Sequence, residues 1–166
     1  MAKITWKLAA GKSWRDKLQH EHPNHGKLVP VPERWRKRYG KGKLLIPRPL
    51  EIDALIRGVR KGRLVTQSQL REELAQRAGA AATCPLTTGI FLRIVAEAAA
   101  EEVTEGKKRV TPYWRVIKDD GGLNPKFPGG VKAQATRLRA EGFKIKPATG
   151  KQPPRVEDFT ASLIRL

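Results

Sequence analysis

The stretch from Thr111 to Phe143 constrains the fold of this chain more than any other part of its sequence. It reads TPYWRVIKDDGGLNPKFPGGVKAQATRLRAEGF. An aromatic pair beside an arginine is followed by a loop rich in glycine and proline, and then by a helical segment that Gly142 closes. The paired glycines directly before that helix let another group approach the backbone closely. The other segments of the chain are therefore interpreted around this one.

Two helices are predicted in the middle of the chain. Apolar residues recur at helical spacing in the first, which begins at Pro49 and is ended by Gly58 and Gly62. Thr66, with Gln69 three residues later, is a capping-box signature for the second helix, and Gly79 stops it. The buried stripes that this spacing predicts are Leu50, Ile52, Leu55, Ile56 and Val59 in the first helix and Leu70, Leu74, Ala75 and Ala78 in the second.

A third helix is predicted after a loop at residues 80–86. Thr87 or Thr88 is expected to cap it. Its apolar face is Ile90, Phe91, Ile94, Val95 and Ala98, and the residues expected to face outward are Arg93, Glu97, Glu101 and Glu102. The second and third helices, joined by this short connection, suit a helix-turn-helix. An ordinary helical hairpin has the same periodicity, so the pattern alone leaves both interpretations open.

The order Pro-x-x-Arg-Val-Ile, a polar turn, Gly-Gly and a helix ending in Glu-Gly resembles the active-site half of the O6-alkylguanine DNA alkyltransferases. The resemblance covers about residues 48–143. It implies a mainly α (α+β) fold with a winged helix-turn-helix domain at residues 48–143. A basic N-terminal extension at residues 1–47 and a basic tail at residues 144–166 lie outside the resemblance. The family's pattern is Pro-Cys-His-Arg-Val, and its cysteine accepts the alkyl group. In this chain Tyr113 occupies the cysteine position and Trp114 the histidine position.

The chemistry of the family needs a thiolate, a base that generates it and an acidic residue that orients the base. Of these three, the resemblance retains only the acidic residue, Glu141. Tyr113 carries a phenol, which is largely protonated near neutral pH and is a poor nucleophile. Arg115 matches an arginine that is usually structural in the family. We therefore expect neither a catalytic residue nor a cofactor at this site.

What the resemblance retains is a pocket for an extruded base. Phe127 takes the place of a pocket tyrosine, and Pro128 replaces a serine that contacts the base. Tyr113, at the former acceptor position, is expected to touch the modified base. Trp114 is interpreted either as a pocket residue or as a core residue. The residues expected to form the lesion pocket are Tyr113, Trp114, Phe127, Pro128, Gly129, Gly130 and Glu141.

The helix-turn-helix is expected to contact the DNA. The segment GRLVTQSQL at residues 62–70 is similar to the one that opens this motif in the family, with Gln67 in place of a tyrosine that presses on a phosphate. The family's second helix also supplies an arginine finger. The matching position falls near residues 85–87, none of which is basic, and Arg93 is the nearest substitute. The residues expected to contact DNA are Thr66, Gln67, Ser68, Thr87, Thr88, Arg93 and Arg115.

The charge of the chain indicates nucleic acid as its partner. Lys and Arg number 34 and Asp and Glu number 16, which gives a formal charge of +18. Residues 1–47 and 107–166 each contribute +9, whereas residues 48–106 are neutral. Such an excess favours a polyanion, and double-stranded DNA is the first expectation. The chain lacks an apolar run long enough for a bilayer and a signal-peptide core, so we expect no membrane partner.

Residues 1–47 are interpreted as an arm in which tryptophans alternate with basic side chains. Trp6, Trp14 and Trp35 either stack on bases while the basic residues follow the DNA backbone, or cover an exposed patch of the main domain. The histidines of the segment HEHPNH do not predict a metal site, because structural zinc needs four Cys or His ligands. The only cysteine, Cys84, excludes an internal disulfide and suits a reducing cytoplasm.

We expect a monomeric, nucleoid-associated protein that binds DNA without enzymatic activity. It would hold an alkylated or otherwise modified guanine outside the duplex and flag it for repair, with a repair protein as a second partner. One alternative is an enzyme acting on a flipped base, either an unconventional alkyltransferase using Cys84 or a glycosylase using Asp119, Asp120 or Glu141. The other is a general nucleoid or regulatory DNA-binding protein in which the pocket is vestigial.

Overall fold

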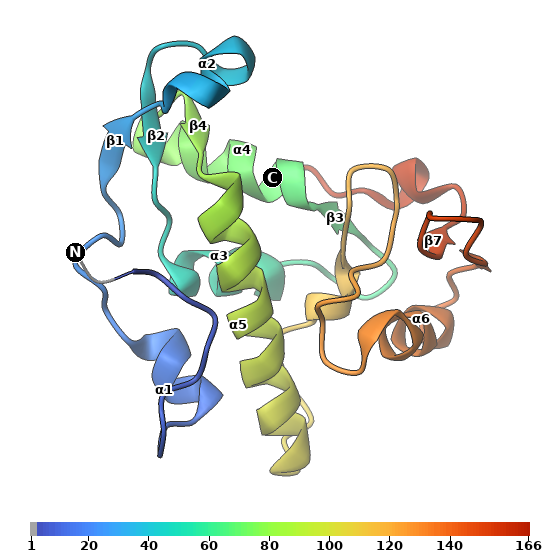
Figure 1. Ribbon diagram of the computed structural model, residues 1–166. Helices are drawn as coiled ribbons and strands as arrows, with labels where there is room; N and C mark the ends of the chain where they lie inside the picture. The colour runs from blue at the N-terminus through green and yellow to red at the C-terminus, as the bar shows by residue number, and fades with distance from the viewer. Residues whose placement is uncertain (1–2) are drawn as a thin grey trace.

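A long helix, α5 (Pro85–Thr104), runs through the middle of the fold (Figure 1). In the computed structural model, which describes residues 3–166, helices α1 (Trp14–Gln19) and α3 (Pro49–Arg57) pack against α5. Helix α4 (Gln67–Ala78) precedes α5 and contributes to the same buried core. The predicted class, mainly α with small sheets, is confirmed.

The predicted start of α3 and both predicted boundaries of α4 are confirmed, whereas α3 ends at Arg57, before the predicted Val59. Helix α3 has a proline at its first position and ends before Gly58. At the start of α4 the Thr66 hydroxyl accepts a hydrogen bond from the Gln69 amide at 3.1 Å, and the Gln69 side chain accepts one from the Thr66 amide at 2.9 Å. Gly79 follows the last turn with a φ of 63°, a left-handed conformation that favours glycine. Local sequence signals therefore set both helices.

The start of α5 differs from the prediction. The sequence predicts a cap at Thr87 or Thr88, but the helix begins at Pro85 with Cys84 as its N-cap. Both threonines lie in the first turn, where their hydroxyls donate to the Cys84 carbonyl oxygen at 3.4 Å and 2.7 Å respectively. Proline is favoured at the first helical position, because it lacks an N–H group that the first turn would leave unpaired. That preference explains the earlier start.

Three small sheets join the segments between the helices. In the first, β2 pairs antiparallel with β1 and parallel with β4, which connects the N-terminal segment to the turn before α5. The second pairs β3 with β5 in parallel, and the third pairs β6 with β7 antiparallel. The strands are β1 (Leu28–Pro30), β2 (Lys43–Leu45), β3 (Val65–Thr66), β4 (Ala82–Thr83), β5 (Val116–Ile117), β6 (Ile145–Lys146) and β7 (Arg155–Val156). The remaining elements are α2 (Glu33–Tyr39), α6 (Gly130–Ala140) and the 3-10 helices η1 (Tyr113–Arg115) and η2 (Phe159–Ser162).

The N-terminal segment packs against α5 (Figure 1). Helix α1 is capped by Ser13 and lies beside the C-terminal half of α5. There the amides of Trp14 and Arg15 donate to the Glu101 carboxylate at 2.9 Å and 3.3 Å. The face of α5 that the sequence predicts to point outward is therefore partly covered. Its half-buried residues are Arg93, Glu97, Glu101 and Glu102.

The C-terminal segment returns to the start of α4. The Leu64 amide donates to the Ser162 carbonyl oxygen, and the Ile164 amide donates to the Leu64 carbonyl oxygen, both at 2.9 Å. The Gln69 side chain also donates to the Ile164 carbonyl oxygen at 2.7 Å. The domain boundaries at residues 47 and 143 stay predictions, but both flanking segments share hydrogen bonds and core contacts with the middle of the chain.

Two clusters of buried side chains hold these elements together. The larger one joins residues of α3, α4, α5, η1 and α6. The smaller one lies between α2 and the first sheet and consists of Val31, Leu44, Ala82 and Cys84, with Trp35 and Tyr39 packed against it. Among the described residues, no helix combines the length and the apolar character needed to cross a lipid bilayer.

Candidate nucleic-acid interface

Helices α4 and α5 are joined by a short connection, residues 79–84, which is braced from two sides. On one side the Thr83 hydroxyl donates to the Arg71 carbonyl oxygen of α4 at 2.8 Å. On the other, the Cys84 amide donates to the Leu45 carbonyl oxygen of β2 at 2.8 Å. The two bonds therefore tie the connection to α4 and to the first sheet.

Three of the predicted DNA contacts are residues whose hydroxyls are engaged inside the protein. Thr66, Thr87 and Thr88 are buried. The Thr66 hydroxyl caps α4, and the other two bind the carbonyl oxygen of Cys84. These threonines therefore stabilise the starts of the two helices and do not present their hydroxyls to a ligand.

The two other predicted contacts at the start of α4 differ from each other. The Ser68 hydroxyl and amide both donate to the Asp119 carboxylate, at 2.5 Å and 3.0 Å, and Arg71 donates to the Ser68 oxygen at 2.9 Å. Gln67, the first residue of α4, is half-buried, and its side chain makes no hydrogen bond within residues 3–166. Its amide is therefore free to donate to a phosphate, whereas Ser68 orients Arg71.

Arg93, the predicted substitute for an arginine finger, is covered by the N-terminal segment. Its guanidinium carbon lies 3.7 Å from the centre of the Trp6 ring. Its Nε atom is buried and has no hydrogen-bond partner within residues 3–166. Since Trp6 remains 38% exposed, the arm places a tryptophan over the helix. This contact, like the packing of Trp14 in the core, agrees with the interpretation in which the tryptophans cover the main domain.

The three predicted pocket rings pack against one another in the core. Tyr113 lies 5.4 Å from Trp114 and 5.4 Å from Phe127, centre to centre, with its ring edge-on to both. The exposed fractions are 6% for Tyr113, 8% for Trp114 and 3% for Phe127, so these rings fill the space between η1 and α6. The Tyr113 hydroxyl makes no hydrogen bond within the described chain. Burial raises the pKa of this phenol, Glu97 adds to the effect and Arg137 opposes it.

Glu141 is held in a buried network beside these rings. Arg115 donates to both of its carboxylate oxygens, the shortest contact being 2.7 Å, and Trp114 donates from its indole nitrogen at 2.9 Å. Only 13% of the Arg115 side chain and 8% of that of Glu141 are exposed. Burial raises the pKa of Glu141, but the hydrogen bonds from Arg115, Trp114 and the Gly62 amide outweigh it and leave the pKa below its usual value.

This network also defines the role of Arg115. Besides Glu141, it binds the Val59 carbonyl oxygen at 2.5 Å, and so it ties η1 to the end of α3 and to α6. The predicted DNA contact at Arg115 is therefore a buried structural arginine.

The paired glycines lie at the start of α6. Gly129 and Gly130 have φ values of 74° and 68°, and a β-carbon on Gly129 would meet that of Ala133 at 2.6 Å. Pro128, before them, is half-buried. Close packing of the helix start on its own next turn therefore requires glycine at position 129. The close approach there is made by the protein itself.

Gln134 is a buried residue that the sequence analysis missed. Its side-chain nitrogen donates to the carbonyl oxygens of Trp114 and Val116 at 3.1 Å and 2.9 Å, and its oxygen accepts from the Asn124 amide at 2.8 Å. It thus ties α6 to η1, β5 and the loop before α6. A polar residue on the face of the predicted helix that also carries Leu138 was the available signal, since residues four apart share one face.

The exposed part of the α5 start was also missed. Leu86 is 61% exposed, and Gly89 is exposed three residues later on the same face. These two positions, and not the threonines between them, are what the first turn of α5 presents to solvent. Their spacing opposite the buried Phe91 was the signal for this face.

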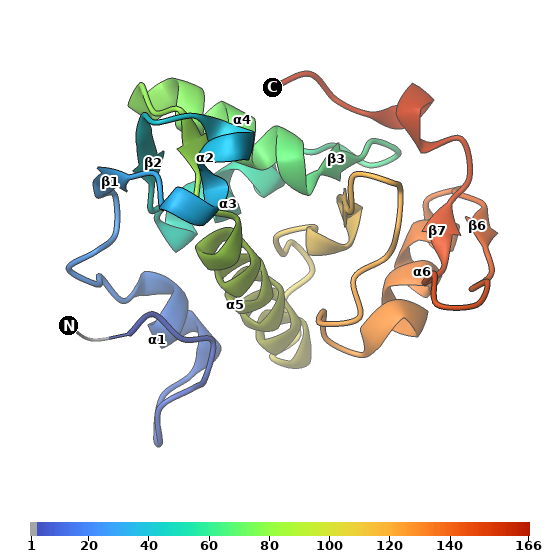
Figure 2. The same cartoon turned by 45° about the horizontal axis from the view of Figure 1, so that its top comes forward.

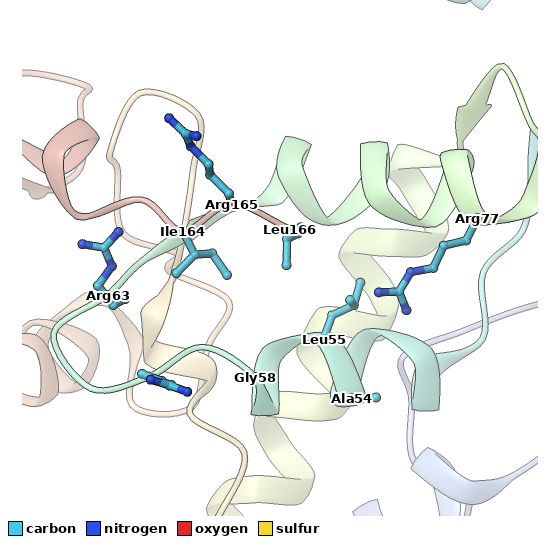
Figure 3. Close-up of a pocket in the computed structure, with 9 residues that line it drawn as sticks. Ala54, Leu55, Gly58, Arg63, Arg77, Ile164, Arg165 and Leu166 are labelled. Carbon is cyan, nitrogen blue, oxygen red and sulfur yellow. The ribbon is translucent and has the colours of Figure 1, made fainter.

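Four arginines surround a separate hollow of about 720 Å³ between α3, α4 and the C-terminal segment (Figure 3). Arg63 and Arg165 lie on one side of it and Arg77 on the other, with Leu55 and Leu166 between them. Two of these arginines have internal partners. Arg77 donates to Glu73 at 2.6 Å, and Arg63 donates to the Leu163 carbonyl oxygen at 2.9 Å. This hollow lies apart from the predicted contacts at the starts of α4 and α5.

Cys84 and the histidine segment occupy packed positions. The Cys84 thiol is buried in the smaller core cluster. The His25 ring packs edge-on against Phe91 at 5.2 Å, and burial lowers the pKa of His25 to about 4. Within residues 3–166, no three His, Cys, Asp or Glu side chains are grouped so that they could hold a metal ion.

Comparison with known proteins gives one structural likeness. No protein-family model matches the sequence, and no curated protein matches it. Among solved structures, the chain is similar to the crystal structure of S. pombe Atl1 in complex with damaged DNA containing O6-carboxymethylguanine. The identity is 16% and the TM-score 0.46, over 71% of this chain and 94% of that chain. At these values the likeness assigns neither a family nor an activity to this protein.

Proposed function

We propose that this protein binds double-stranded DNA through the helix-turn-helix of α4 and α5 and recognises alkylated or otherwise modified bases without chemical conversion, so that they are flagged for repair. The observation that carries the proposal is the braced connection between α4 and α5, which lies beside the exposed basic side chains of α2 that form no ion pair within residues 3–166. A repair-protein partner, a monomeric state and a cytoplasmic location stay predictions.

The electrostatics of the chain support binding through phosphates. A formal charge of +18 leaves many basic side chains without an acidic partner, and DNA offers a regular row of phosphates. At the start of α4, Gln67 has a free amide and Arg71 is held in place by Ser68. With about six phosphate contacts, affinity should fall about a thousandfold between 50 and 200 mM salt.

Recognition of a modified base would take place at Tyr113. Its hydroxyl is free of internal hydrogen bonds, and the raised pKa keeps it protonated, so it can donate to an oxygen of a base. A purine stacked at this point has to displace a ring, because Tyr113, Trp114 and Phe127 fill the space. The proposal therefore includes movement of at least one of these rings when a base is extruded.

The positions of the candidate reactive groups favour binding over chemistry. The Cys84 thiol is buried in the smaller core cluster, so it is not exposed to a substrate. Asp119 accepts from Ser68, Asp120 accepts from the Gly122 amide, and Glu141 is engaged by Arg115. A nucleophile or general base has to be within reach of its substrate, and these groups are occupied by protein donors.

A competition assay tests the proposal. Wild type, Tyr113→Phe and Tyr113→Ala are each bound to a labelled duplex. An unlabelled competitor, either an O6-methylguanine duplex or its unmodified counterpart, is then titrated in. Wild type should prefer the modified duplex by about tenfold, which corresponds to one good hydrogen bond, and Tyr113→Phe should lose most of that preference. The phenylalanine variant keeps the ring, so its loss cannot be blamed on a cavity. Equal affinity of wild type for both duplexes would contradict lesion recognition.

The closed packing of the three rings favours a second candidate function. A general DNA-binding protein needs no pocket, and in it the rings would serve only as core. That candidate predicts the same affinity for modified and unmodified duplexes in all three proteins, together with the same steep salt dependence.

A further inference from the structure

Helix α2 and the residues after it carry a dense group of unpaired positive charges, which we call the α2 basic group. All of its side chains are exposed, and within residues 3–166 none forms an ion pair. The only acidic residue of α2 is Glu33. The α2 basic group consists of Arg34, Arg36, Lys37, Arg38, Lys41 and Lys43.

The inner face of α2 fixes this group relative to the helix-turn-helix. Trp35 and Tyr39 pack edge-on at 6.5 Å and rest on the smaller core cluster, which includes Ala82 and Cys84 of the turn before α5. The parallel pairing of β2 with β4 adds backbone hydrogen bonds between the same two segments. Figure 2 shows α2 in front of the first sheet, near α4 and the upper end of α5. The α2 basic group is therefore held beside the turn of the helix-turn-helix.

A hollow of about 430 Å³ separates α2 from α4. Arg38 and Tyr39 line it from α2, Ser68, Arg71 and the exposed Glu72 line it from α4, and residues 80–83 of the turn complete its lining. Arg71 donates to the Ser68 hydroxyl at 2.9 Å and lies 3.9 Å from the Asp119 carboxylate, and 15% of its side chain is exposed. Two arginines from different elements thus face one shallow hollow.

We propose that the α2 basic group and this hollow form a second phosphate-binding element, which extends the DNA contact of the helix-turn-helix along one strand. The inference rests on the proposed DNA binding but not on lesion recognition. Trp35 and Tyr39 are half-buried on the smaller core cluster, and the guanidinium groups of Arg34 and Arg38 lie over their rings at 4.7 Å and 5.3 Å, so cations cover the apolar part of this surface. A phosphodiester chain needs cations alone, whereas a membrane surface or a protein groove also rewards exposed apolar side chains.

The test compares two triple variants of the full chain with equal loss of charge. Arg34→Gln/Lys37→Gln/Arg38→Gln removes three charges from the α2 basic group. Lys107→Gln/Lys108→Gln/Arg109→Gln removes three exposed charges just beyond the far end of α5. Affinity for an unmodified 24-base-pair duplex is measured by fluorescence anisotropy at 50 to 200 mM salt, after circular dichroism has established that each variant is folded.

The α2 variant should bind about 10- to 100-fold more weakly than wild type at low salt, and its slope of log affinity against log salt should be smaller by about 2 to 3. The control variant should change affinity by less than about threefold, since screening weakens charges more than a Debye length from the DNA. Equal losses in both variants, or no loss in the α2 variant, would overturn the inference. So would an α2 variant that loses binding to anionic phosphatidylserine vesicles while its DNA affinity is unchanged.

Failure of this inference differs from failure of the proposed function. If wild type binds both duplexes of the competition assay equally, lesion recognition is lost but the α2 basic group still stands. If wild type prefers the modified duplex and the α2 variant binds like wild type, the inference about the α2 basic group is lost but lesion recognition still stands.

Discussion

Charged residues behave in opposite ways in two regions of the molecule. One is the ring network between η1 and α6, which consists of Tyr113, Trp114, Arg115, Phe127 and Glu141, and the other is the α2 basic group. In the ring network the charged pair of Arg115 and Glu141 is buried and fully engaged. In the α2 basic group Arg34, Lys37 and Arg38 are exposed and have no acidic partner within residues 3–166, although Arg34 and Arg38 lie over the rings of Trp35 and Tyr39. The difference teaches that an arginine marks a binding surface only when the fold leaves it without an internal ion pair. A sequence motif identifies the arginine but does not show whether another residue of the protein already binds it.

The largest expected effect comes from a substitution in the ring network. Glu141→Gln leaves Arg115 buried without its partner and should lower the free energy of unfolding by about 3 kcal/mol. DNA affinity of the folded protein should stay within twofold of wild type. Urea unfolding at pH 7 measures the first quantity and anisotropy the second, with the exposed Glu157→Gln as control. A stable Glu141→Gln protein with weakened DNA binding would mean that this network belongs to the interface.

Acid pH should destabilise the N-terminal segment, which carries both His25 and the α2 basic group. Burial lowers the pKa of His25 to about 4, and the ring accepts a hydrogen bond from the His22 amide, so the folded state favours neutral His25. The unfolded chain therefore binds more protons between pH 6.5 and 4, and the stability contributed by His25 is complete above pH 6.5 and is lost as the pH falls toward 4.

After allowance for partial solvent exposure, this loss should be about 1 kcal/mol. Urea unfolding of wild type at pH 7.5 and 5 measures it. His25→Asn should reduce the difference between the two pH values, whereas the exposed His20→Asn should leave it unchanged. If His25→Asn retains the full difference, the acid sensitivity arises elsewhere.

The smallest expected effect concerns Arg93, which belongs neither to the ring network nor to the α2 basic group. It lies on α5 but is covered by Trp6. Trp6→Ala should cost about 0.5 to 1 kcal/mol of stability through loss of the cation–π contact. If the uncovered guanidinium then reaches a phosphate, DNA affinity should rise a few-fold, and the double variant Trp6→Ala/Arg93→Gln should lose that gain. An affinity of Trp6→Ala below that of wild type would show instead that Trp6 itself contacts the DNA.

Local signals in the sequence predicted part of this fold well. The capping box of Thr66 and Gln69 and the stop at Gly79 each act on the adjacent end of α4, so the start and end of this helix could be predicted directly. The cap of α5 was misplaced because Pro85 competes with Thr87 and Thr88 for the helix start. Boundaries fail where two local signals conflict.

Contacts distant in sequence were the ones that could not be predicted. The cover over α5 depends on the bond between the Trp14 amide and Glu101, which no periodicity reports. The buried bond between Arg115 and Glu141 joins residues whose types were noted but whose pairing was not. For the same reason Tyr113 and Phe127 were placed in an open pocket, although their packing closes it. Residue type suggested a site, and only packing decides whether it is open.

The most direct test of the account is an NMR titration of the uniformly 15N-labelled protein with a 12-base-pair duplex at low salt. The account predicts amide shift changes at the start of α4, in the turn at residues 80–89 and along residues 34–43. Changes confined to the arginine-lined hollow around Arg63 and Arg165, or no changes at all, would contradict it.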